Sequence, residues 1–212
     1  MQYYPLFLDI RDKPVLLIGG GNIAYEKVLN LLKAGAKITI VSPDLLPPLA
    51  RFNKRVTWIK KWFDPSDIRT DYFLVFGATG DSSLNSEISK LCLQKRILCN
   101  TVDDPKYCHF IVPSILRRGK LTLAISTAGV SPTLAKSIKS TLKLILGPEY
   151  TVFTRWVSQF RQQVLARIPT LAQRMAFWNA FYSCQPLDVL REQGREKLTQ
   201  LGEEILVSHE GR

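Results

Sequence analysis

The chain alternates short apolar runs with segments in which apolar residues recur at helical spacing. Apolar residues recur at helical spacing after Ala24 as far as Gly35 and again over 84–95, which predicts a helix in each segment. A further short helix is expected at 45–51. The apolar runs, which are typical of strands, occupy residues 5–10, 15–18, 37–41, 56–59, 72–76 and 97–99. Strands that alternate with helices predict right-handed crossovers and a parallel, doubly wound α/β sheet.

The pattern changes after Pro113. Two short strands are expected at 114–116 and 121–125, and Ser131-Pro132 then begins a helix, because a capping serine followed by proline favours a helix start. Amphipathic helices follow up to the C-terminal region. We therefore predict three parts: a Rossmann-type domain over 1–113, a middle α/β segment over 114–147 and a helical domain over 148–212.

A glycine-rich loop lies between the second strand and the following helix. Its sequence, Gly19-Gly20-Gly21-Asn22-Ile23-Ala24, has the G-x-G-x-x-A spacing of a dinucleotide-binding loop. Gly19 would permit the tight turn, Gly21 would let the backbone approach a pyrophosphate, and Ala24 would let the helix pack closely. The helix N-terminus would then offer N–H groups to the phosphates. The alternative is an ordinary structural turn.

Ligands of open α/β sheets bind beyond the carboxyl ends of the strands, where four loops of this chain are expected to meet. One is the glycine loop, and another is Ser42-Pro43-Asp44, in which Asp44 is the acid nearest to the ribose-binding position. No Arg or Lys directly follows the strand at 37–41 to hold a 2′-phosphate, and this favours NAD over NADP. The other two loops are 77–81, with Ala78 and Thr79, and 100–105.

Several polar residues are candidates for chemistry. Asp103, in Asp103-Asp104-Pro105, would follow the strand predicted at 97–99 and could serve as a general base, or the segment could be a solvated turn. His109 could act as a base or ligand, although a single histidine is more often structural. Thr127 and Ser131 could bind an anion at a helix N-terminus.

Composition and charge narrow the function further. The net charge is +11, and residues 114–182 carry 10 Lys and Arg against one acid, Glu149. Such a block favours a polyanion, either nucleic acid, a membrane surface or a small ligand with many carboxylates, or is simply a solvated face. The sequence shows no apolar run of 18 residues and no signal peptide, and its 4 cysteines form no C-x-x-C pair. We therefore expect a cytoplasmic protein.

These motifs resemble the precorrin-2 dehydrogenase family, the sirohydrochlorin-forming part of siroheme synthases. The resemblance runs almost without gaps over residues 2–145. The segments that carry it are Pro5-Leu-Phe-Leu, Val15–Ala24, Val41-Ser-Pro, Gly77-Ala-Thr-Gly-Asp, Asn100-Thr-Val-Asp-Asp-Pro, Phe110-Ile-Val-Pro-Ser and Ala124-Ile-Ser-Thr-Ala-Gly-Val-Ser-Pro. A linked series of this kind is more specific than the glycine loop alone.

The resemblance implies that NAD oxidises precorrin-2 to sirohydrochlorin, with Asp103 as the essential aspartate. It implies a homodimer formed through the middle segment, without a nucleic-acid or membrane partner, and a stand-alone form without a fused methyltransferase domain. The implied cofactor contacts are Gly19, Gly21, Asn22, Ile23, Ala24, Ser42, Pro43, Asp44, Ala78 and Thr79. The implied contacts to the polycarboxylate tetrapyrrole are His109, Ser114, Arg117, Thr127, Ser131 and Lys136.

The chain departs from the family in places, and other functions stay open. Some members have a serine where this chain has Thr127, and Arg117-Arg118-Gly119 replaces a run in which an acid and a proline can occur. One alternative is a bifunctional dehydrogenase and ferrochelatase, although no metal-ligand cluster is evident. The others are an NAD(H)-responsive protein that binds DNA and a tetrapyrrole-binding protein without turnover.

Overall fold

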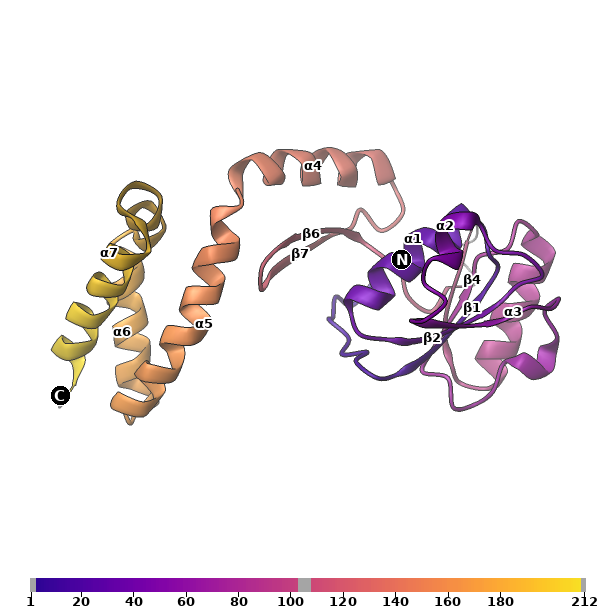
Figure 1. The fold of residues 1–212 in the computed structure, drawn as a ribbon, viewed down its shortest axis with the longest axis horizontal. Helices are drawn as coiled ribbons and strands as arrows, with labels where there is room; N and C mark the ends of the chain where they lie inside the picture. The colour runs from indigo at the N-terminus through magenta and orange to yellow at the C-terminus, as the bar shows by residue number, and fades with distance from the viewer. Residues whose placement is uncertain (1–2, 103–107, 211–212) are drawn as a thin grey trace. The chain divides into compact units, whose positions relative to one another are not determined.

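The structure, a computed structural model, describes residues 3–102 and 108–210. The chain divides into two compact units, Met1–Val112 and Pro113–Arg212. The first carries a sheet with helices, and the second carries a hairpin and four helices (Figure 1). The subdivision of the second unit at residue 147 stays a prediction.

The first unit contains a five-stranded parallel sheet with strand order β3-β2-β1-β4-β5. This order places β1 at the centre and confirms the expected doubly wound α/β fold. Strands β1, β2 and β4 are labelled in Figure 1. The strands are β1 (Pro14–Ile18), β2 (Lys37–Val41), β3 (Val56–Ile59), β4 (Leu74–Gly77) and β5 (Leu98–Thr101).

Helices cover both faces of the sheet. Val15 and Leu17 of β1 belong to the core beneath α1 (Asn22–Lys33) and α2 (Pro47–Ala50). Leu16 and Ile18 belong to the opposite core, beneath α3 (Ser82–Gln94). Successive side chains of a strand point to opposite faces, so a central strand must be apolar at every position.

The expected strand at residues 5–10 does not form. Residues 4–9 are exposed and lie outside both sheets. In the described part of this unit, the one helical element that was not expected is the 3₁₀ turn η1 (Pro65–Asp67). Both edges of β1 are occupied by β2 and β4. The next strand along the chain therefore offers no free edge with which residues 5–10 could pair.

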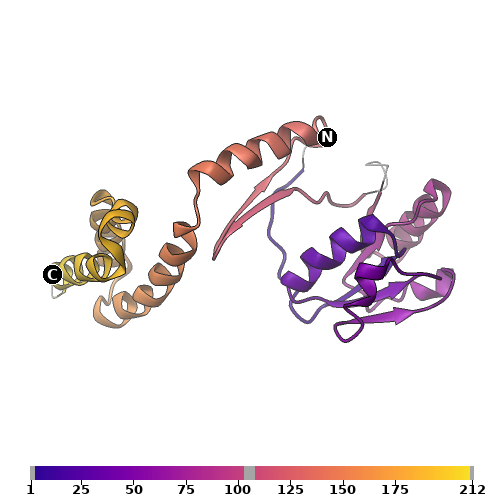
Figure 2. The ribbon, with the colours of Figure 1, turned by 45° about the horizontal axis from the view of Figure 1, so that its top comes forward.

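The second unit begins with an antiparallel hairpin. Strands β6 (Ser114–Arg118) and β7 (Leu121–Ile125) lie side by side as a two-stranded ribbon (Figure 2). In their register, Ser114 pairs with Ile125. Helix α4 (Pro132–Ile145) packs on the hairpin, and α5 (Glu149–Arg167) contacts both of its strands. No helix within the described ranges is both long enough and apolar enough to cross a membrane.

The remaining helices enclose an aromatic core. Helix α5 packs against α7 (Pro186–His209), and α7 packs against α6 (Leu171–Ser183). Phe177 is fully buried, and its ring lies 6.2 Å from that of Phe160 and 6.1 Å from that of Phe181. Pro169 lies between α5 and α6 and separates the two helices.

We expect Phe177→Ala to destabilise the helical part of the second unit. Removing a fully buried ring forfeits its burial and leaves a cavity, which costs about 3–5 kcal/mol. Denaturant unfolding measures this loss, and Leu171→Ala is the control because Leu171 on the same helix is 72% exposed. A change of less than about 0.5 kcal/mol, as is usual for surface sites, would show that this core does not depend on Phe177.

Candidate functional site

Gly19 closes the end of β1 against two neighbouring strands. Its N–H donates to the Val41 carbonyl oxygen at 2.9 Å. Its φ is +114°, and a Cβ at this position would lie 2.3 Å from the Ala78 carbonyl oxygen. A side chain would therefore be strained by backbone conformation and would collide with backbone atoms. Glycine is required here to bring the ends of β1, β2 and β4 together.

Gly19→Ala is expected to lower the free energy of unfolding by about 2 kcal/mol or more, because both a positive φ and a close backbone contact oppose the new methyl group. Chemical denaturation measures this change. Gly80→Ala is the matched control, since a Cβ at Gly80 has no neighbour within 4 Å among the described residues. Equal stability of the two variants would contradict the tight turn.

Gly20 packs against the loop after β2. A Cβ on Gly20 would lie 2.1 Å from the Asp44 carbonyl oxygen, and the Gly20 carbonyl accepts the Leu46 N–H at 2.8 Å. The Ser42 hydroxyl donates to the same Asp44 carbonyl at 2.7 Å. Ser42 is buried, and its carbonyl accepts the Trp58 indole N–H at 3.0 Å. Ser42 thus shapes the loop, whereas Asp44 is exposed.

Gly21 lies at the N-terminal end of α1 and leaves it open. It is the N-cap residue and makes no side-chain cap bond, and a Cβ added to it would meet nothing within 4 Å among the described residues. The first turn of α1 contains no acidic residue. Ala24 is fully buried and holds the helix on the sheet, while Asn22 and Ile23 are exposed. This cradle therefore suits an anion such as a pyrophosphate.

The loop after β4 is held by Asn85, which was not among the predicted site residues. The Thr79 hydroxyl donates to Asn85 Oδ1 at 2.7 Å, and Asn85 Nδ2 donates to the Thr79 carbonyl at 3.2 Å. Asn85 is 2% exposed. The Asp81 carboxylate accepts the N–H groups of Ser83 and Leu84 and so caps α3. Ala78 and Thr79 therefore lie in a fixed loop beside Gly19.

The carboxyl end of β5 was predicted to carry the general base. Asp103 lies outside the described residues, so its role stays a prediction. His109 forms two hydrogen bonds with β5. Its ring Nδ1 accepts the Cys99 backbone N–H at 3.1 Å, and its backbone N–H donates to the Cys99 carbonyl at 2.9 Å. One ring nitrogen therefore has a structural partner, and a substrate contact would have to use Nε2.

Lys27 is a residue of this region that the sequence analysis missed. Its ammonium donates to Asn100 Oδ1 at 3.2 Å and lies 5.4 Å from the centre of the Phe76 ring. Burial lowers the pKa of Lys27 below its usual value, because desolvation disfavours the charged form. Lys27 and Asn100 are 73 positions apart, so no local pattern links them.

The candidate residues of the second unit fall into two groups. Thr127 and Ser131 lie together: the Thr127 hydroxyl accepts the Ser131 N–H at 3.1 Å and donates to its carbonyl at 3.0 Å. The Ser131 hydroxyl accepts the Leu134 N–H and caps α4, as expected. Arg117 on β6 and Lys136 on α4 are exposed. The two hydroxyls thus fix the loop, and the cations are available to a ligand.

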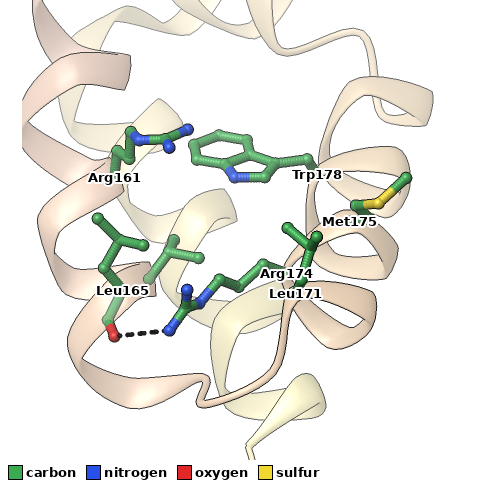
Figure 3. Close-up of a pocket in the computed structure, with 7 residues that line it drawn as sticks. Arg161, Leu165, Leu171, Arg174, Met175 and Trp178 are labelled. Atoms are coloured by element: carbon green, nitrogen blue, oxygen red, sulfur yellow. Dashed lines mark hydrogen bonds between the residues drawn. The ribbon is translucent and has the colours of Figure 1, made fainter.

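A separate pocket of about 170 Å³ lies between α5 and α6 (Figure 3). None of the predicted site residues lines it. Arg174 there donates through Nε to the Ile168 carbonyl and through Nη2 to the Pro169 carbonyl, so its guanidinium caps the end of α5. The other lining residues are Arg161, Val164, Leu165, Leu171, Met175 and Trp178. We assign it no part in the chemistry.

The first unit is therefore a dinucleotide-binding Rossmann fold, because a parallel sheet, a required glycine turn and an open helix N-terminus occur together. Comparison with known families supports this class. A family model described as "Putative NAD(P)-binding" matches residues 6–114, which is more than half of the chain. A second model, described as "Sirohaem synthase dimerisation region", matches residues 149–206.

The chain belongs to this NAD(P)-binding family, and its curated relatives confirm the resemblance to siroheme synthases. A siroheme synthase of Sodalis glossinidius is 39% identical over 184 residues, which cover 84% of this chain and 38% of the relative. One of Zymomonas mobilis is 38% identical over 185 residues, covering 86% and 39%. The chain thus spans about two fifths of the length of these relatives.

A solved structure titled "SirC, precorrin-2 dehydrogenase" shares the fold. Its TM-score is 0.72 over 96% of this chain and 98% of that one, at 24% sequence identity. This likeness confirms the combination of a Rossmann sheet with a helical C-terminal part. The family model over residues 6–114 independently supports a nicotinamide dinucleotide as the cofactor. No group of three or more possible metal-ligating side chains lies together in residues 3–102 and 108–210.

Proposed function

We propose that this protein catalyses the NAD-dependent dehydrogenation of precorrin-2 to sirohydrochlorin in siroheme synthesis. The observation that carries the proposal is the open cradle at Gly21, in a chain whose curated relatives are named siroheme synthases. The likeness to a precorrin-2 dehydrogenase structure supports the fold on which this chemistry would run.

The cofactor would lie across the carboxyl end of the sheet. The N–H groups at Gly21, Asn22 and Ile23 would receive the pyrophosphate, and Pro43 and Asp44 would face the adenosine ribose. Asp44 is exposed and its carboxylate is available to ribose hydroxyls. Because no Lys or Arg directly follows β2, we propose NAD rather than NADP.

The reaction removes a hydride and a proton from the substrate. When bound, NAD⁺ supplies the hydride acceptor at nicotinamide C4. The protein orients the macrocycle and accepts the proton, and we assign the proton to the Asp103 carboxylate. The products are sirohydrochlorin, NADH and the proton, so electrons and atoms balance.

The basic block of the second unit would bind the carboxylates of the tetrapyrrole. Glu149, the single acid in residues 114–182, is already paired with Arg191 at 2.6 Å, so it does not neutralise the block. Arg117 and Lys136 are exposed, and exposed cations attract a polycarboxylate. His109, Ser114, Thr127 and Ser131 are proposed as further contacts.

We propose that two copies associate through residues 114–147. Helix α4 leaves large apolar side chains exposed, which is typical of a surface that binds a partner. Leu134 is 50% exposed and Ile145 is 60% exposed. The matched dimerisation model covers 149–206, so the helices that follow are a second place to look for the interface.

We place the enzyme in the cytoplasm. Its four cysteines form no disulfide within the described part of the chain, and Cys92 and Cys99 are buried thiols. Cysteines that stay as free thiols are typical of proteins in a reducing compartment. Fractionation of the native host with an antibody to the chain would test this placement.

Anaerobic turnover tests the proposed function. Enzymatically generated precorrin-2 and NAD⁺ are mixed with the protein, and NADH and the sirohydrochlorin spectrum are followed together. We expect equal amounts of both products. NAD⁺ binding without either product would overturn the proposal and favour a binding protein, while iron-dependent conversion of sirohydrochlorin would reveal an additional ferrochelatase activity.

A further inference from the structure

Lys27 is a largely buried cation with an unusual set of neighbours. It extends from α1 toward β4 and β5, where its ammonium meets Asn100 Oδ1 at 3.2 Å and the Phe76 ring at 5.4 Å. No carboxylate pairs with it among the described residues. Desolvation of an ammonium is costly, and the contacts with Asn100 and Phe76 offset part of that cost.

The ammonium determines how the Asn100 side chain is oriented. Lysine only donates hydrogen bonds, so the amide oxygen of Asn100 must face it. The amide nitrogen is then directed away and donates to the Phe110 carbonyl at 3.0 Å. Asn100 is 8% exposed, so water cannot readily replace either partner. Lys27 is therefore linked through one amide to the segment that follows the β5 loop.

That segment is fastened to β5 at successive residues. His109 exchanges two hydrogen bonds with Cys99. Cys108 Sγ accepts the Thr101 N–H at 3.3 Å and donates to the Thr101 carbonyl at 3.2 Å. The Phe110 ring meets the Phe76 ring edge-on at 5.5 Å, beneath the Lys27 ammonium. Residues 108–110 are thus held against the carboxyl end of β5.

We propose that Lys27 is a positioning residue for the dehydrogenation, acting through Asn100 to hold residues 108–110 against the carboxyl end of β5. This inference rests on the proposed function, since that end of the sheet is where substrate and nicotinamide would meet. His109, a proposed substrate contact, belongs to the held segment. Lys27 itself need not touch the substrate.

The test compares Lys27→Met, which keeps the length of the side chain and removes its charge, with Lys27→Arg and Lys33→Met. Lys33 lies on the same helix and is exposed, so Lys33→Met is the matched control. For Lys27→Met we expect a kcat lowered by about 10- to 100-fold, because small displacements of reacting groups are costly. The KM for NAD⁺ should stay within about twofold, because the glycine loop is untouched. Lys27→Arg, which keeps the charge, should have a kcat close to that of the wild type.

Amide hydrogen exchange provides a readout that is independent of turnover. The N–H groups of Thr101 and His109 should exchange faster in Lys27→Met, while those of β1 keep their protection. Asn100→Asp keeps an oxygen for the ammonium but removes the amide donor to Phe110, so it should expose the same two N–H groups. The double variant should add little, as expected for two residues that act in one network.

The outcomes separate this inference from the proposed function. Unchanged exchange in Lys27→Met, or an equal loss of kcat in Lys33→Met, would overturn the positioning role. A rise in the KM for NAD⁺ equal to the fall in kcat would also overturn it, because it would indicate damage to the cofactor site. Absence of turnover in the wild type would contradict the proposed dehydrogenase, while the exchange rates would still decide whether Lys27 holds the segment.

Discussion

Replacing Gly21 with aspartate is expected to abolish NAD binding while leaving the fold intact. Gly21 has extended backbone angles, φ −87° and ψ −163°, and its Cβ would enter open space. Aspartate is a favoured N-cap residue, so α1 should become slightly more stable. Its carboxylate would occupy the N–H groups that we assign to the pyrophosphate. Like charges brought together at a binding site cost several kcal/mol, which lowers affinity by about 100-fold or more.

Calorimetric titration with NAD⁺ measures the loss, and thermal unfolding checks the fold. Asn53→Asp is the control for the added charge, because Asn53 is exposed and precedes β3, at the end of the sheet opposite to the glycine loop. We expect a normal affinity for that variant. Undiminished NAD binding by Gly21→Asp would show that the α1 N-terminus is not the pyrophosphate site, whatever the family assignment.

The glycine loop could be predicted from the sequence because its determinants are local. A strand, a turn and a helix succeed one another within residues 15–34, and the role of each glycine follows from that order. The structure adds the reason at Gly19, whose close contact is with Ala78 at the end of β4. The parallel sheet could likewise be predicted, since a fully apolar run such as Leu74–Phe76 suits only a strand covered on both faces.

The remaining features depend on contacts that a single sequence does not display. The apolar run at 5–10 suggested a strand, because burial patterns do not reveal whether a partner edge is available. His109 was singled out for chemistry, yet its Nδ1 is bound to the backbone of Cys99. Lys27 was overlooked because it becomes notable only when β5 places Asn100 beside it. Each of these outcomes is decided by tertiary packing.

Asp103→Asn is expected to lower kcat by about 10²- to 10⁴-fold, the usual contribution of a general base. The residue follows β5 by two positions, and the family resemblance assigns it the essential role. Asparagine has nearly the same shape but cannot accept the proton. NAD affinity should be unchanged, because the proposed cofactor contacts at Gly21 and Asp44 belong to other loops. Single-turnover measurement of NADH formation, together with NAD⁺ titration, measures both effects.

Asp104→Asn is the matched control for this variant, because it removes the neighbouring carboxylate and leaves the proposed base in place. If Asp103 accepts the proton, the wild-type rate should fall toward acid pH as its carboxylate becomes protonated, and Asp103→Asn should lose that dependence while Asp104→Asn keeps it. Equal losses in both variants would mean that the charge of the pair, rather than one base, supports the reaction. Full activity in Asp103→Asn would leave the dehydrogenase in place and transfer the proton to another group, for which the exposed ring of His109 is then the first candidate.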